Sequence, residues 1–494
     1  MAYYLFGACL GLLGLLARIA VWRVAGASAV DQHYWSVAAK AYQEQQGLPV
    51  RIVGKYLMED EEQAYPPFFG ILVGRLLPDY LKNYATLVIE GLELAGLAGF
   101  MAILGLPPGA IVMAASFYIA APVLVVYNAQ LTPRILGDFF LSSAMALQVL
   151  ATLPSMSAWR ATMCWAGSAL MLGLMFMTHK MTYQLHLVLL PFWAWALHSW
   201  VVLLPTLLGI LIFVVTAGPR FALLQLRAHW DIVSFWNRHW KDLGAHQFMD
   251  SPLYGDGNAT PGGRFHGAGL RGAIKHLRVA VSYAPFATVL PMISLALDYW
   301  PPTWVMVWLG VTCVWALATL FVPPLKCFGG GHLYLFNAII PGVLYIAFLP
   351  REAATYVGLG IALLLTLTAL WLGWRTVKNR PMARGEDFQE ALQYLRTLPD
   401  ARIAVFPLQA AEAVAAQSGH AVLWGGHGYG FRNLEGFFPV FTRPLSEYVR
   451  RYNVGWILWD SLFWPQGEVV LLREKMMATS GQLRSFGRWR LARL

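Results

Sequence analysis

Charged residues are scarce in this sequence. They make up 13% of its 494 residues, whereas hydrophobic residues make up 58%. Soluble domains average about 25% charged residues, and the mean hydropathy of this chain is +0.52. These values exclude a wholly soluble protein and place most of the chain in lipid.

Cysteine is also scarce. Of four cysteines, Cys9, Cys164 and Cys313 lie inside apolar segments, and Cys327 lies alone in a loop. The sequence after Cys327 contains none, so no disulfide framework is predicted, and cysteine usage does not reveal the redox compartment.

Several functional motifs are missing. There is no Gly-rich phosphate loop with nucleotide-binding spacing and no basic soluble module with interleaved aromatics, which argues against nucleic acid as a partner. The twelve histidines show no spacing typical of a zinc site. The net charge of +10 fits basic residues that meet anionic lipid head groups, or basic loops that hold a phosphate-bearing substrate.

Long apolar runs are abundant. A helix needs about 20 apolar residues to cross the hydrocarbon core, and the sequence predicts a polytopic α-helical membrane protein with about eleven such helices. The first is not followed by a small-residue cleavage site, so we interpret it as a retained helix. The sixth and seventh are separated by Trp200 alone; if they form one helix, everything after them changes sides. The predicted spans are 2–22, 83–104, 109–127, 135–153, 160–177, 184–199, 201–218, 279–297, 303–323, 333–350 and 354–374.

Nearly every substantial polar segment follows an odd-numbered helix, and the turns on the other side are short. One face of the membrane therefore carries almost all the available chemistry, which favours an enzyme at one surface over a channel lined from end to end. Lysine and arginine are concentrated on this face, which alone would make it cytoplasmic. Long loops are largely exempt from that rule, so charge leaves the orientation open. The polar segments are 24–82, 127–134, 178–183, 218–279, 324–332 and 375–494.

Two of these segments have amphipathic character. In the first outer loop, 24–82, helical spacing of apolar residues predicts a surface helix over 31–46 with Asp31 at its N-cap, and a second short helix over 67–78. In the long loop 218–279, the first half predicts an interfacial helix with tryptophans at the head-group level. The second half is typical of a loop, either a lid over the active face or a simple connection.

The C-terminal segment has soluble character. Helical and strand patterns alternate from Glu386 to Asp460, which predicts a small parallel sheet with helices packed on it. We expect a transmembrane domain over 1–380 and a soluble α/β domain over 381–494.

Asp31 is the first candidate for chemistry. A carboxylate at the membrane boundary is partly desolvated, which raises its pKa toward the range of a general base. The alternative is a plain N-cap, worth about 1 kcal/mol.

The stretch from Arg18 through Asp31-Gln32-His33-Tyr34 to Tyr65-Pro66-Pro67-Phe68 resembles the opening of the GT-C superfamily of membrane glycosyltransferases, in the style of aminoarabinose and protein O-mannosyl transferases. The resemblance implies a cytoplasmic N-terminus, amphipathic helices in the first outer loop, and an active face outside the membrane. For a bacterial protein, that face and the C-terminal domain would be periplasmic, at the inner membrane.

The resemblance also implies residue roles. Asp31 becomes the catalytic base that deprotonates the acceptor, and Tyr34 and Tyr65 become substrate-binding residues. The second acidic residue of the family is sought in the run Glu59-Asp60-Glu61-Glu62, with Glu59 and Asp60 as the first candidates. Asp138 is the alternative, because an acid inside a membrane helix is costly and usually functional.

Basic residues in the outer loops are the expected phosphate ligands. Arg134 can hold a phosphate bidentately or snorkel at a helix end. His179 and Lys180 either meet the lipid phosphate or belong to a solvated interfacial turn. Lys326, His332 and Tyr334 lie where the family often has Arg-Tyr, with His332 in place of that Arg.

These observations predict an inverting transferase that moves a sugar from a polyprenyl-phosphate donor to a lipid, glycan or protein acceptor. The sugar and the acceptor are not specified. Some relatives need a divalent cation such as Mg²⁺ or Mn²⁺, and the acidic run leaves that open. The alternatives are an O-antigen ligase or polymerase, with its key Arg and His in 219–279, a lipid or solute transporter, and a non-catalytic membrane subunit.

Overall fold

The structure is a computed structural model of the whole chain. It describes residues 30–243, 298–350, 385–425, 429–435, 443–477 and 483–494, together with scattered residues within 12–19, 274–295 and 360–371. The predicted spans 2–22, 279–297 and 354–374 lie largely outside the described residues. The count of eleven spans therefore stays a prediction.

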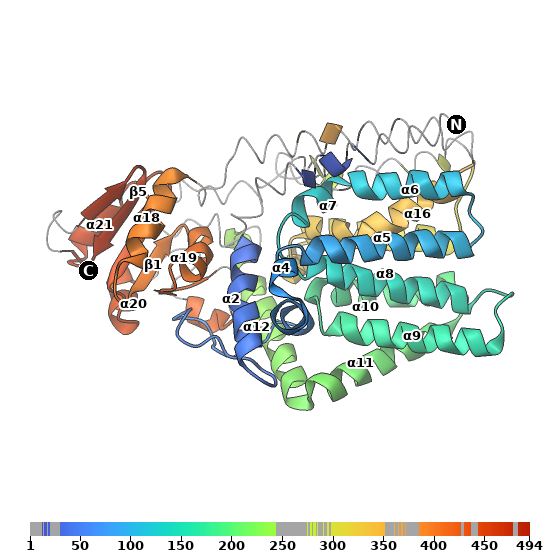
Figure 1. Cartoon of the computed structure of the whole chain (residues 1–494), viewed down its shortest axis with the longest axis horizontal. Helices are drawn as coiled ribbons and strands as arrows, with labels where there is room; N and C mark the ends of the chain where they lie inside the picture. The colour runs from blue at the N-terminus through green and yellow to red at the C-terminus, as the bar shows by residue number, and fades with distance from the viewer. Residues whose placement is uncertain are drawn as a thin grey trace.

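Apolar helices form one bundle in which neighbouring helices run side by side (Figure 1). Five of the described helices are long and apolar enough to cross a membrane, which confirms a polytopic helical protein. The bundle helices are α5 (Ala85–Ile103), α6 (Pro108–Ala120), α7 (Pro122–Tyr127), α8 (Arg134–Ala151), α9 (Ala158–Phe176), α10 (Lys180–Ala196), α11 (Leu203–Ala217), α15 (Thr303–Phe321) and α16 (Ile339–Phe348).

The boundary at Trp200 separates two helices. The helix α10 ends at Ala196, His198 has a positive φ of 49°, and a single 3-10 turn, η2 (Trp200–Val202), leads into α11. The chain thus reverses between α10 and α11. The connection between them is short, and the long loop 218–279 follows α11, as the predicted alternation requires. Two predicted spans differ from their structures. The span 109–127 is broken at Ala121 into α6 and α7, because Pro122 lacks the N–H that would continue α6. The span 333–350 begins as a 3-10 segment, and α16 starts only at Ile339.

The first outer loop folds against the end of the bundle that carries the long connections. Its main helix, α2 (Val30–Glu44), begins one residue earlier than predicted, so Asp31 lies in the first turn and not at the N-cap. A carboxylate there still faces the positive end of the helix dipole. The short helices α3 (Phe68–Ile71), η1 (Leu72–Leu76) and α4 (Asp79–Lys82) follow.

The predicted interfacial helix of the long loop is present as α12 (Pro219–Leu243). Figure 1 shows α12 near α2, at the same end of the bundle. The predicted loop over the second half of 218–279 lies outside the described residues. Two 3-10 segments, η5 (Pro323–Phe328) and η6 (Gly331–Ala338), connect α15 to α16 near α12.

The C-terminal part forms a five-stranded sheet in the order β2-β1-β3-β5-β4. Strands β1 (Arg402–Phe406), β2 (Ala421–Val422) and β3 (Trp456–Asp460) are parallel, as predicted. The pair β4 (Leu483–Phe486) and β5 (Trp489–Arg493) was not predicted, and β5 joins β3 antiparallel. The sheet is therefore mixed, not purely parallel. The last hairpin lacks a regular alternation of apolar and polar residues, since Arg490 and Arg493 are three residues apart in β5. The helices of this part are α18 (Glu386–Arg396), α19 (Ala411–Gln417), α20 (Leu445–Arg451) and α21 (Gly467–Arg473).

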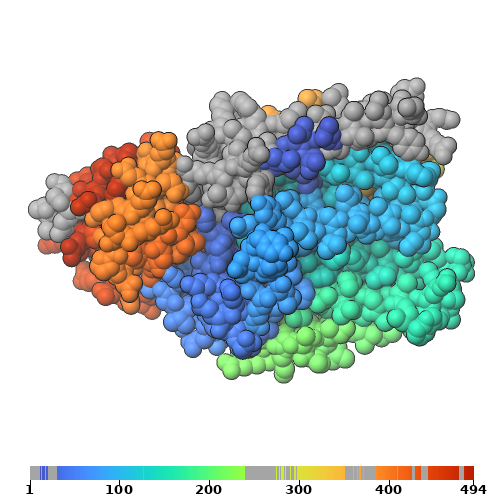
Figure 2. All heavy atoms as spheres, viewed as in Figure 1, coloured from blue at the N-terminus to red at the C-terminus, as the bar shows by residue number. Residues whose placement is uncertain are grey.

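The sheet is held against the first outer loop by main-chain hydrogen bonds. Leu57 and Met58 donate N–H groups to the carbonyls of Val422 and Leu423, at 2.9 and 3.0 Å, and Val422 donates to Lys55. Residues 55–58 thus lie along the outer edge of β2 and cover an edge strand that would otherwise be free to pair with another chain. In Figure 2 the C-terminal part adjoins the blue first loop. The first loop therefore contacts both the membrane bundle and the sheet.

Candidate functional site

A cavity of about 320 Å³ lies where the first loop, the bundle and α12 meet. Its polar lining comes from distant parts of the chain, because the described parts of the long connections lie at the same end of the bundle. The first loop supplies Asp31 and Tyr65, the turn before α8 supplies Thr132, and Arg134 begins α8. Residues of α10, α12 and the η5 region complete the wall. The lining side chains that can take part in polar chemistry are Asp31, Tyr65, Tyr127, Gln130, Thr132, Arg134, His179, Lys180, Gln184, His229 and Cys327.

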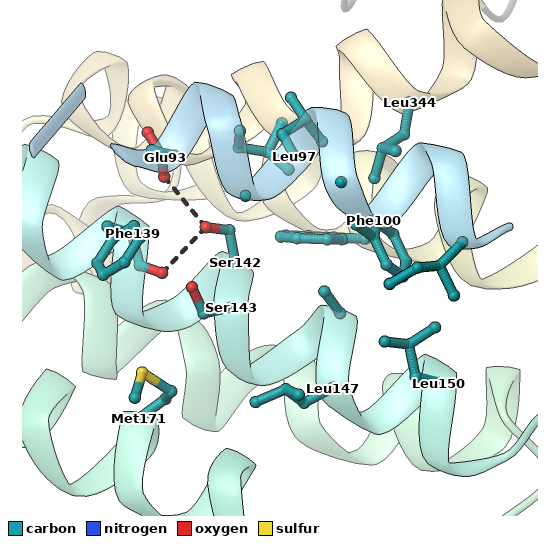
Figure 3. Close-up of a pocket in the computed structure, with 16 residues that line it drawn as sticks. Glu93, Leu97, Phe100, Phe139, Ser142, Ser143, Leu147, Leu150, Met171 and Leu344 are labelled. Atoms are coloured by element: carbon teal, nitrogen blue, oxygen red, sulfur yellow. Dashed lines mark hydrogen bonds between the residues drawn. The ribbon is translucent and has the colours of Figure 1, made fainter. Parts of the chain in front are cut away.

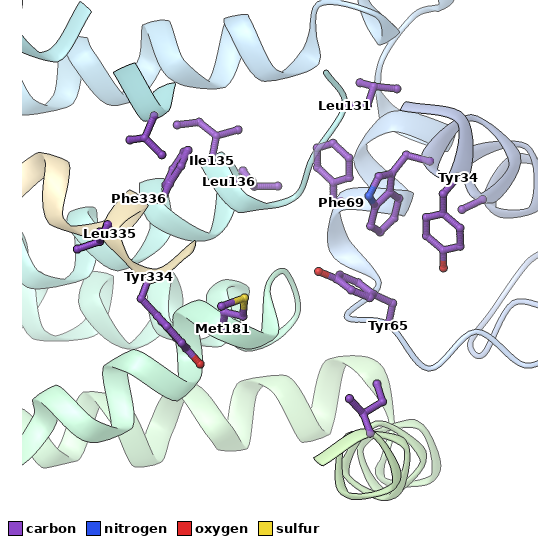
Figure 4. Packing of buried hydrophobic residues seen from close by; sticks show 14 of the residues in the cluster. Tyr34, Tyr65, Phe69, Leu131, Ile135, Leu136, Met181, Tyr334, Leu335 and Phe336 are labelled. Carbon is purple, nitrogen blue, oxygen red and sulfur yellow. The ribbon is translucent and has the colours of Figure 1, made fainter. Parts of the chain in front are cut away.

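Asp31 and Tyr65 form the first-loop wall of the cavity. Asp31 is partly exposed, and Tyr65 is buried beside Trp35, with ring centroids 5.3 Å apart in an edge-to-face arrangement. Burial raises the pKa of Tyr65 above its ordinary value, so its hydroxyl stays protonated and can donate. Figure 4 shows Tyr65 turned toward the helices that carry Met181 and Tyr334.

Arg134 is buried at the start of α8. Its side chain is stacked over the ring of Tyr127 at 5.1 Å, and it donates to the carbonyl of Leu333 at 3.4 Å. The Nε atom of Arg134 is buried without a hydrogen-bond partner among the described residues. These contacts fix the plane of the guanidinium but leave much of its donor capacity unused.

His179 and Lys180 stand at the start of α10, ahead of the apolar span. The Nζ of Lys180 lies over the ring of Tyr65, 5.7 Å from its centroid. Burial, with Arg134 and Lys180 close by, holds the pKa of His179 well below its ordinary value. His179 is therefore neutral, and its Nδ1 lies 2.8 Å from the Thr182 hydroxyl. It can supply a hydrogen bond to a ligand but no charge.

The two remaining cations are poorly compensated. Arg134 has a carbonyl and the sulfur of Met181 as its described partners, and burial together with Arg134 lowers the pKa of Lys180 to about 8. Among the described residues no carboxylate neutralises either side chain. Burying a charge without a partner is costly, so this pair of cations is suited to an anionic ligand such as a phosphate.

The predicted second acids lie away from the cavity, against the C-terminal sheet. Glu59 accepts a hydrogen bond from the N–H of Gly425 at 2.6 Å, and Asp60 is paired with Arg432. Glu61 and Glu62 are paired with Arg51 and Arg220 respectively. The acidic run therefore ties the first loop to neighbouring segments.

Four further predicted residues lie behind the cavity wall. Tyr34 is buried and donates to Gln63 at 2.6 Å; Figure 4 shows it on the side of α2 away from Met181. Tyr334 is buried and donates to Gln184 at 2.6 Å. Asp138 is buried one turn below Arg134 and accepts from Asn337 at 2.6 Å. His332 is buried at the start of η6.

Lys326 is also outside the lining; it precedes the lining residue Cys327 in η5 and is partly exposed. The cavity thus brings together Asp31, Tyr65, Arg134, His179 and Lys180 from the predicted set.

Sequence reasoning missed Gln184 and His229. Gln184 follows shortly after the predicted basic pair His179 and Lys180, yet no role is predicted for it. His229 is one of the twelve histidines whose spacing fits no zinc site. The available signal was its place on the interfacial helix, whose polar face turns toward the other outer loops.

A second cavity, of about 430 Å³, lies within the bundle between α5 and α8. Figure 3 shows its apolar walls, with Leu97, Phe100, Leu147 and Leu150, and the buried Glu93 at one end, where Ser142 donates to it. Apart from that end the lining is hydrocarbon, which suits a lipid chain more than a polar substrate.

The lining of the polar cavity does not fit a Mg²⁺ or Mn²⁺ site. Asp31 is the one carboxylate among the described lining residues, and Arg134 and Lys180 share the cavity with it. Two poorly compensated cations repel a third. In the part of the chain that the structure describes, no cluster of three or more His, Cys, Asp or Glu side chains is arranged to hold a metal.

The arrangement resembles solved membrane proteins. ArnT from Cupriavidus metallidurans, in the apo state, superposes with a TM-score of 0.57 at 11% identity over 98% of this chain and 97% of that chain. The oligosaccharyltransferase AglB from Archaeoglobus fulgidus superposes with a TM-score of 0.56 at 12% identity, over 94% of this chain and 71% of that chain. The chain has the GT-C fold.

The GT-C fold rests on structure alone. No protein-family model matches the sequence, and no curated protein is significantly similar to it. Identities of 11–12% show a shared fold and do not by themselves transfer an activity. Two of these GT-C neighbours were solved with polyprenyl phosphates: ArnT with undecaprenyl phosphate, and AglB with dolichol-phosphate and an inhibitory peptide. AglB was also solved with zinc and sulfate.

Proposed function

We propose that this protein is a glycosyltransferase that moves a sugar from a polyprenyl-phosphate donor to an acceptor hydroxyl, with Asp31 as the base. The observation that carries the proposal is the composition of the polar cavity. One carboxylate, Asp31, shares it with two poorly compensated buried cations, Arg134 and Lys180. A base for the acceptor and an anion site for the leaving group are the two parts that such a transfer needs.

The transfer balances as a single displacement. The acceptor oxygen forms a bond to the anomeric carbon as its proton passes to the Asp31 carboxylate. The bond between the anomeric carbon and the phosphate oxygen breaks, and its electron pair leaves with the polyprenyl phosphate. Arg134 and Lys180 stabilise the charge that grows on that phosphate. Attack from the side opposite the leaving group inverts the anomeric centre.

Tyr65 and His179 are the neutral donors of the site. The Tyr65 hydroxyl stays protonated because burial raises its pKa, and His179 is held neutral. Both can donate to sugar hydroxyls or phosphate oxygens without adding charge. In this proposal the acids Glu59 and Asp60 are positioning residues, which fix the first loop to the C-terminal sheet and so hold α2 and Asp31 in place.

The apolar cavity between α5 and α8 suits the lipid part of the donor. It shares α8 with the polar cavity, since Arg134 begins the helix and Ser142 to Leu150 line the apolar space. Isoprenyl units would be stabilised there by burial of hydrocarbon. We place the active face and the C-terminal domain outside the cytoplasm, at the inner membrane of a bacterium, with the N-terminus inside.

The decisive experiment is sugar transfer with and without the base. Membranes containing the wild type or Asp31→Asn receive a polyprenyl-phosphate donor with a labelled sugar and total membrane glycans as acceptor. Loss of a general base costs about 10²–10⁴-fold in rate, so we expect Asp31→Asn to reduce transfer by at least about a hundredfold. Binding of polyprenyl phosphate should remain within a few-fold of the wild type.

Asp79→Asn is the matched control. Asp79 lies in the same loop but outside the cavity, with its side chain 89% exposed and paired with Lys82. It should transfer at the wild-type rate. Equal transfer by Asp31→Asn and the wild type would remove Asp31 as base and return attention to Glu59, Asp60 and Asp138. Absence of transfer by the wild type from every lipid donor tested would favour the ligase or transporter alternatives.

A further inference from the structure

His229 lies on α12 and lines the polar cavity together with Arg134 and Lys180. It is mostly buried, and its ring packs edge-on against Tyr183, with centroids 5.9 Å apart and planes at 63°. That packing fixes the plane of the imidazole. Its position relative to the cavity is therefore set before any ligand arrives.

A chain of hydrogen bonds fixes the tautomer of His229. The Tyr334 hydroxyl has one proton and two acceptors within reach, Oε1 of Gln184 at 2.6 Å and the carbonyl of Phe328 at 3.0 Å. Donation to the nearer acceptor, Gln184, orients the amide so that its Nε2 faces the histidine. The Nε2 atoms of Gln184 and His229 are 2.9 Å apart. An amide nitrogen can only donate, so the histidine Nε2 must accept. A neutral imidazole then carries its proton on Nδ1.

The imidazole is neutral at ordinary pH. Burial, with the charge of Lys180 nearby, lowers the pKa of His229 to about 4. The ring thus has one N–H, and the preceding contacts place it on Nδ1. The Nδ1 atom is buried and has no hydrogen-bond partner among the described residues. A buried donor without a partner costs free energy that a ligand acceptor would recover.

Resting on the proposed function, we propose that His229 is a further ligand-binding residue of the transfer site, which donates its Nδ1–H to a phosphate oxygen of the polyprenyl-phosphate donor. Phosphate is the fitting acceptor because Lys180 is one of the two cations that would hold it. The charge of Lys180 lies close enough to His229 to lower the pKa of its imidazole. A phosphate offers several acceptor oxygens, so Arg134, Lys180 and His229 can bind it from different sides.

The role differs from that of the two cations. His229 contributes a neutral donor that strengthens as charge develops on the leaving oxygen. Tyr334 and Gln184 are positioning residues in this scheme, since they act through the tautomer of His229. This gives Tyr334 a function different from direct substrate binding.

Three substitutions distinguish the roles of the two ring nitrogens of His229. The full-length protein in detergent is tested as His229→Ala, His229→Asn and His229→Gln, because the amide nitrogen of Asn occupies the place of Nδ1 and that of Gln the place of Nε2. Binding of undecaprenyl monophosphate is measured directly, along with KM for the donor and for the acceptor. A hydrogen bond to a charged group is worth about ten- to a hundredfold in affinity.

We expect His229→Ala and His229→Gln to weaken undecaprenyl phosphate binding and to raise the donor KM by at least about tenfold. His229→Asn should stay within about threefold of the wild type, and the acceptor KM should be unchanged in all three. The control is His198→Asn, at the short turn between α10 and η2, where φ is 49° and asparagine is well tolerated. It should bind like the wild type.

Equal binding by His229→Ala, His229→Asn and the wild type would overturn the inference. Wild-type binding by His229→Gln together with weak binding by His229→Asn would overturn it as well. If the wild type and His229→Ala both transfer sugar normally, this inference alone is overturned and the proposed function stands. A wild type that neither binds undecaprenyl phosphate nor transfers sugar would overturn the proposed function as well, so the two failures are distinguishable.

Discussion

At the scale of single residues, the site depends on charges that are buried without full compensation. Arg134 and Lys180 line the cavity close to each other, and Asp31 lines it from the first loop. Such a site is unfavourable when empty and becomes favourable when an anion enters. The same residues stabilise little in the unliganded fold, which is why they are better explained by binding than by folding.

The pH dependence of donor binding tests this view. The folded-state pKa of Lys180 is lowered to about 8, so its charge is present below that pH and is lost as pH rises through it. Undecaprenyl phosphate is a phosphate monoester and stays ionised over this range, since the second pKa of such a monoester is about 6. We expect the affinity for undecaprenyl phosphate to fall as pH rises above about 8, measured by direct binding.

Lys180→Arg is the control for that titration. Arginine stays protonated, so the fall in affinity above about pH 8 should disappear in this variant even if its absolute affinity is lower. A profile that falls equally in both proteins would assign the titration to another group and leave Lys180 without a role in binding.

At the scale of elements, close helix contacts place the basic residues. A Cβ built on Gly137 of α8 would lie 2.7 Å from Cβ of His179 and 3.0 Å from the Thr182 hydroxyl. The start of α10 therefore packs directly on α8, one turn from Arg134. This contact brings residues from the second and third outer segments to one cavity.

Gly137→Ala tests that contact. The added methyl group has no room, so it must push the start of α10 away from α8, with an expected loss of about 1–3 kcal/mol in stability. Because His179 and Lys180 move with α10, we also expect a raised donor KM. Gly91→Ala on α5 is the matched control, since nothing lies within 4 Å of its built Cβ. Thermal unfolding and donor KM are measured on both; equal values would contradict the packing argument.

At the scale of the whole molecule, the long connections share one end of the bundle, and the C-terminal sheet sits on them. The sheet contacts residues 55–60 through main-chain bonds, and Glu435 is paired with Arg238 and His239 of α12. The C-terminal domain thereby holds both the first loop and α12, which each supply part of the cavity wall. The proposed chemistry on one membrane face is consequently a property of the entire arrangement.

Sidedness is the prediction that belongs to this scale. An alkaline phosphatase reporter fused after Leu494 should be active in a bacterial host, because the enzyme folds only outside the cytoplasm. The same reporter inserted after Gly105, in a short turn on the other side, should be inactive. The opposite pair of results would place the active face in the cytoplasm, as the positive charge of the outer loops alone suggests.

The sequence by itself determined the membrane bundle and the face that carries the chemistry. Apolar runs of sufficient length must form helices in lipid, and the alternation of long and short connections followed from counting them. The sequence also named the basic residues Arg134, His179 and Lys180 from their places in the outer segments. Asp31 was a candidate from its place near the membrane boundary, and its role as base, like the binding role of Tyr65, came from the resemblance to the GT-C opening.

Only the tertiary structure decided which candidates share a cavity. Glu59 and Asp60 are closer to Tyr65 in sequence than Asp31 is, yet they contact the C-terminal domain, because residues 55–58 follow the edge of β2. His229 is 198 residues from Asp31 and reaches the same cavity because α12 folds back over the first loop. Contacts between distant segments depend on packing, which local patterns do not encode.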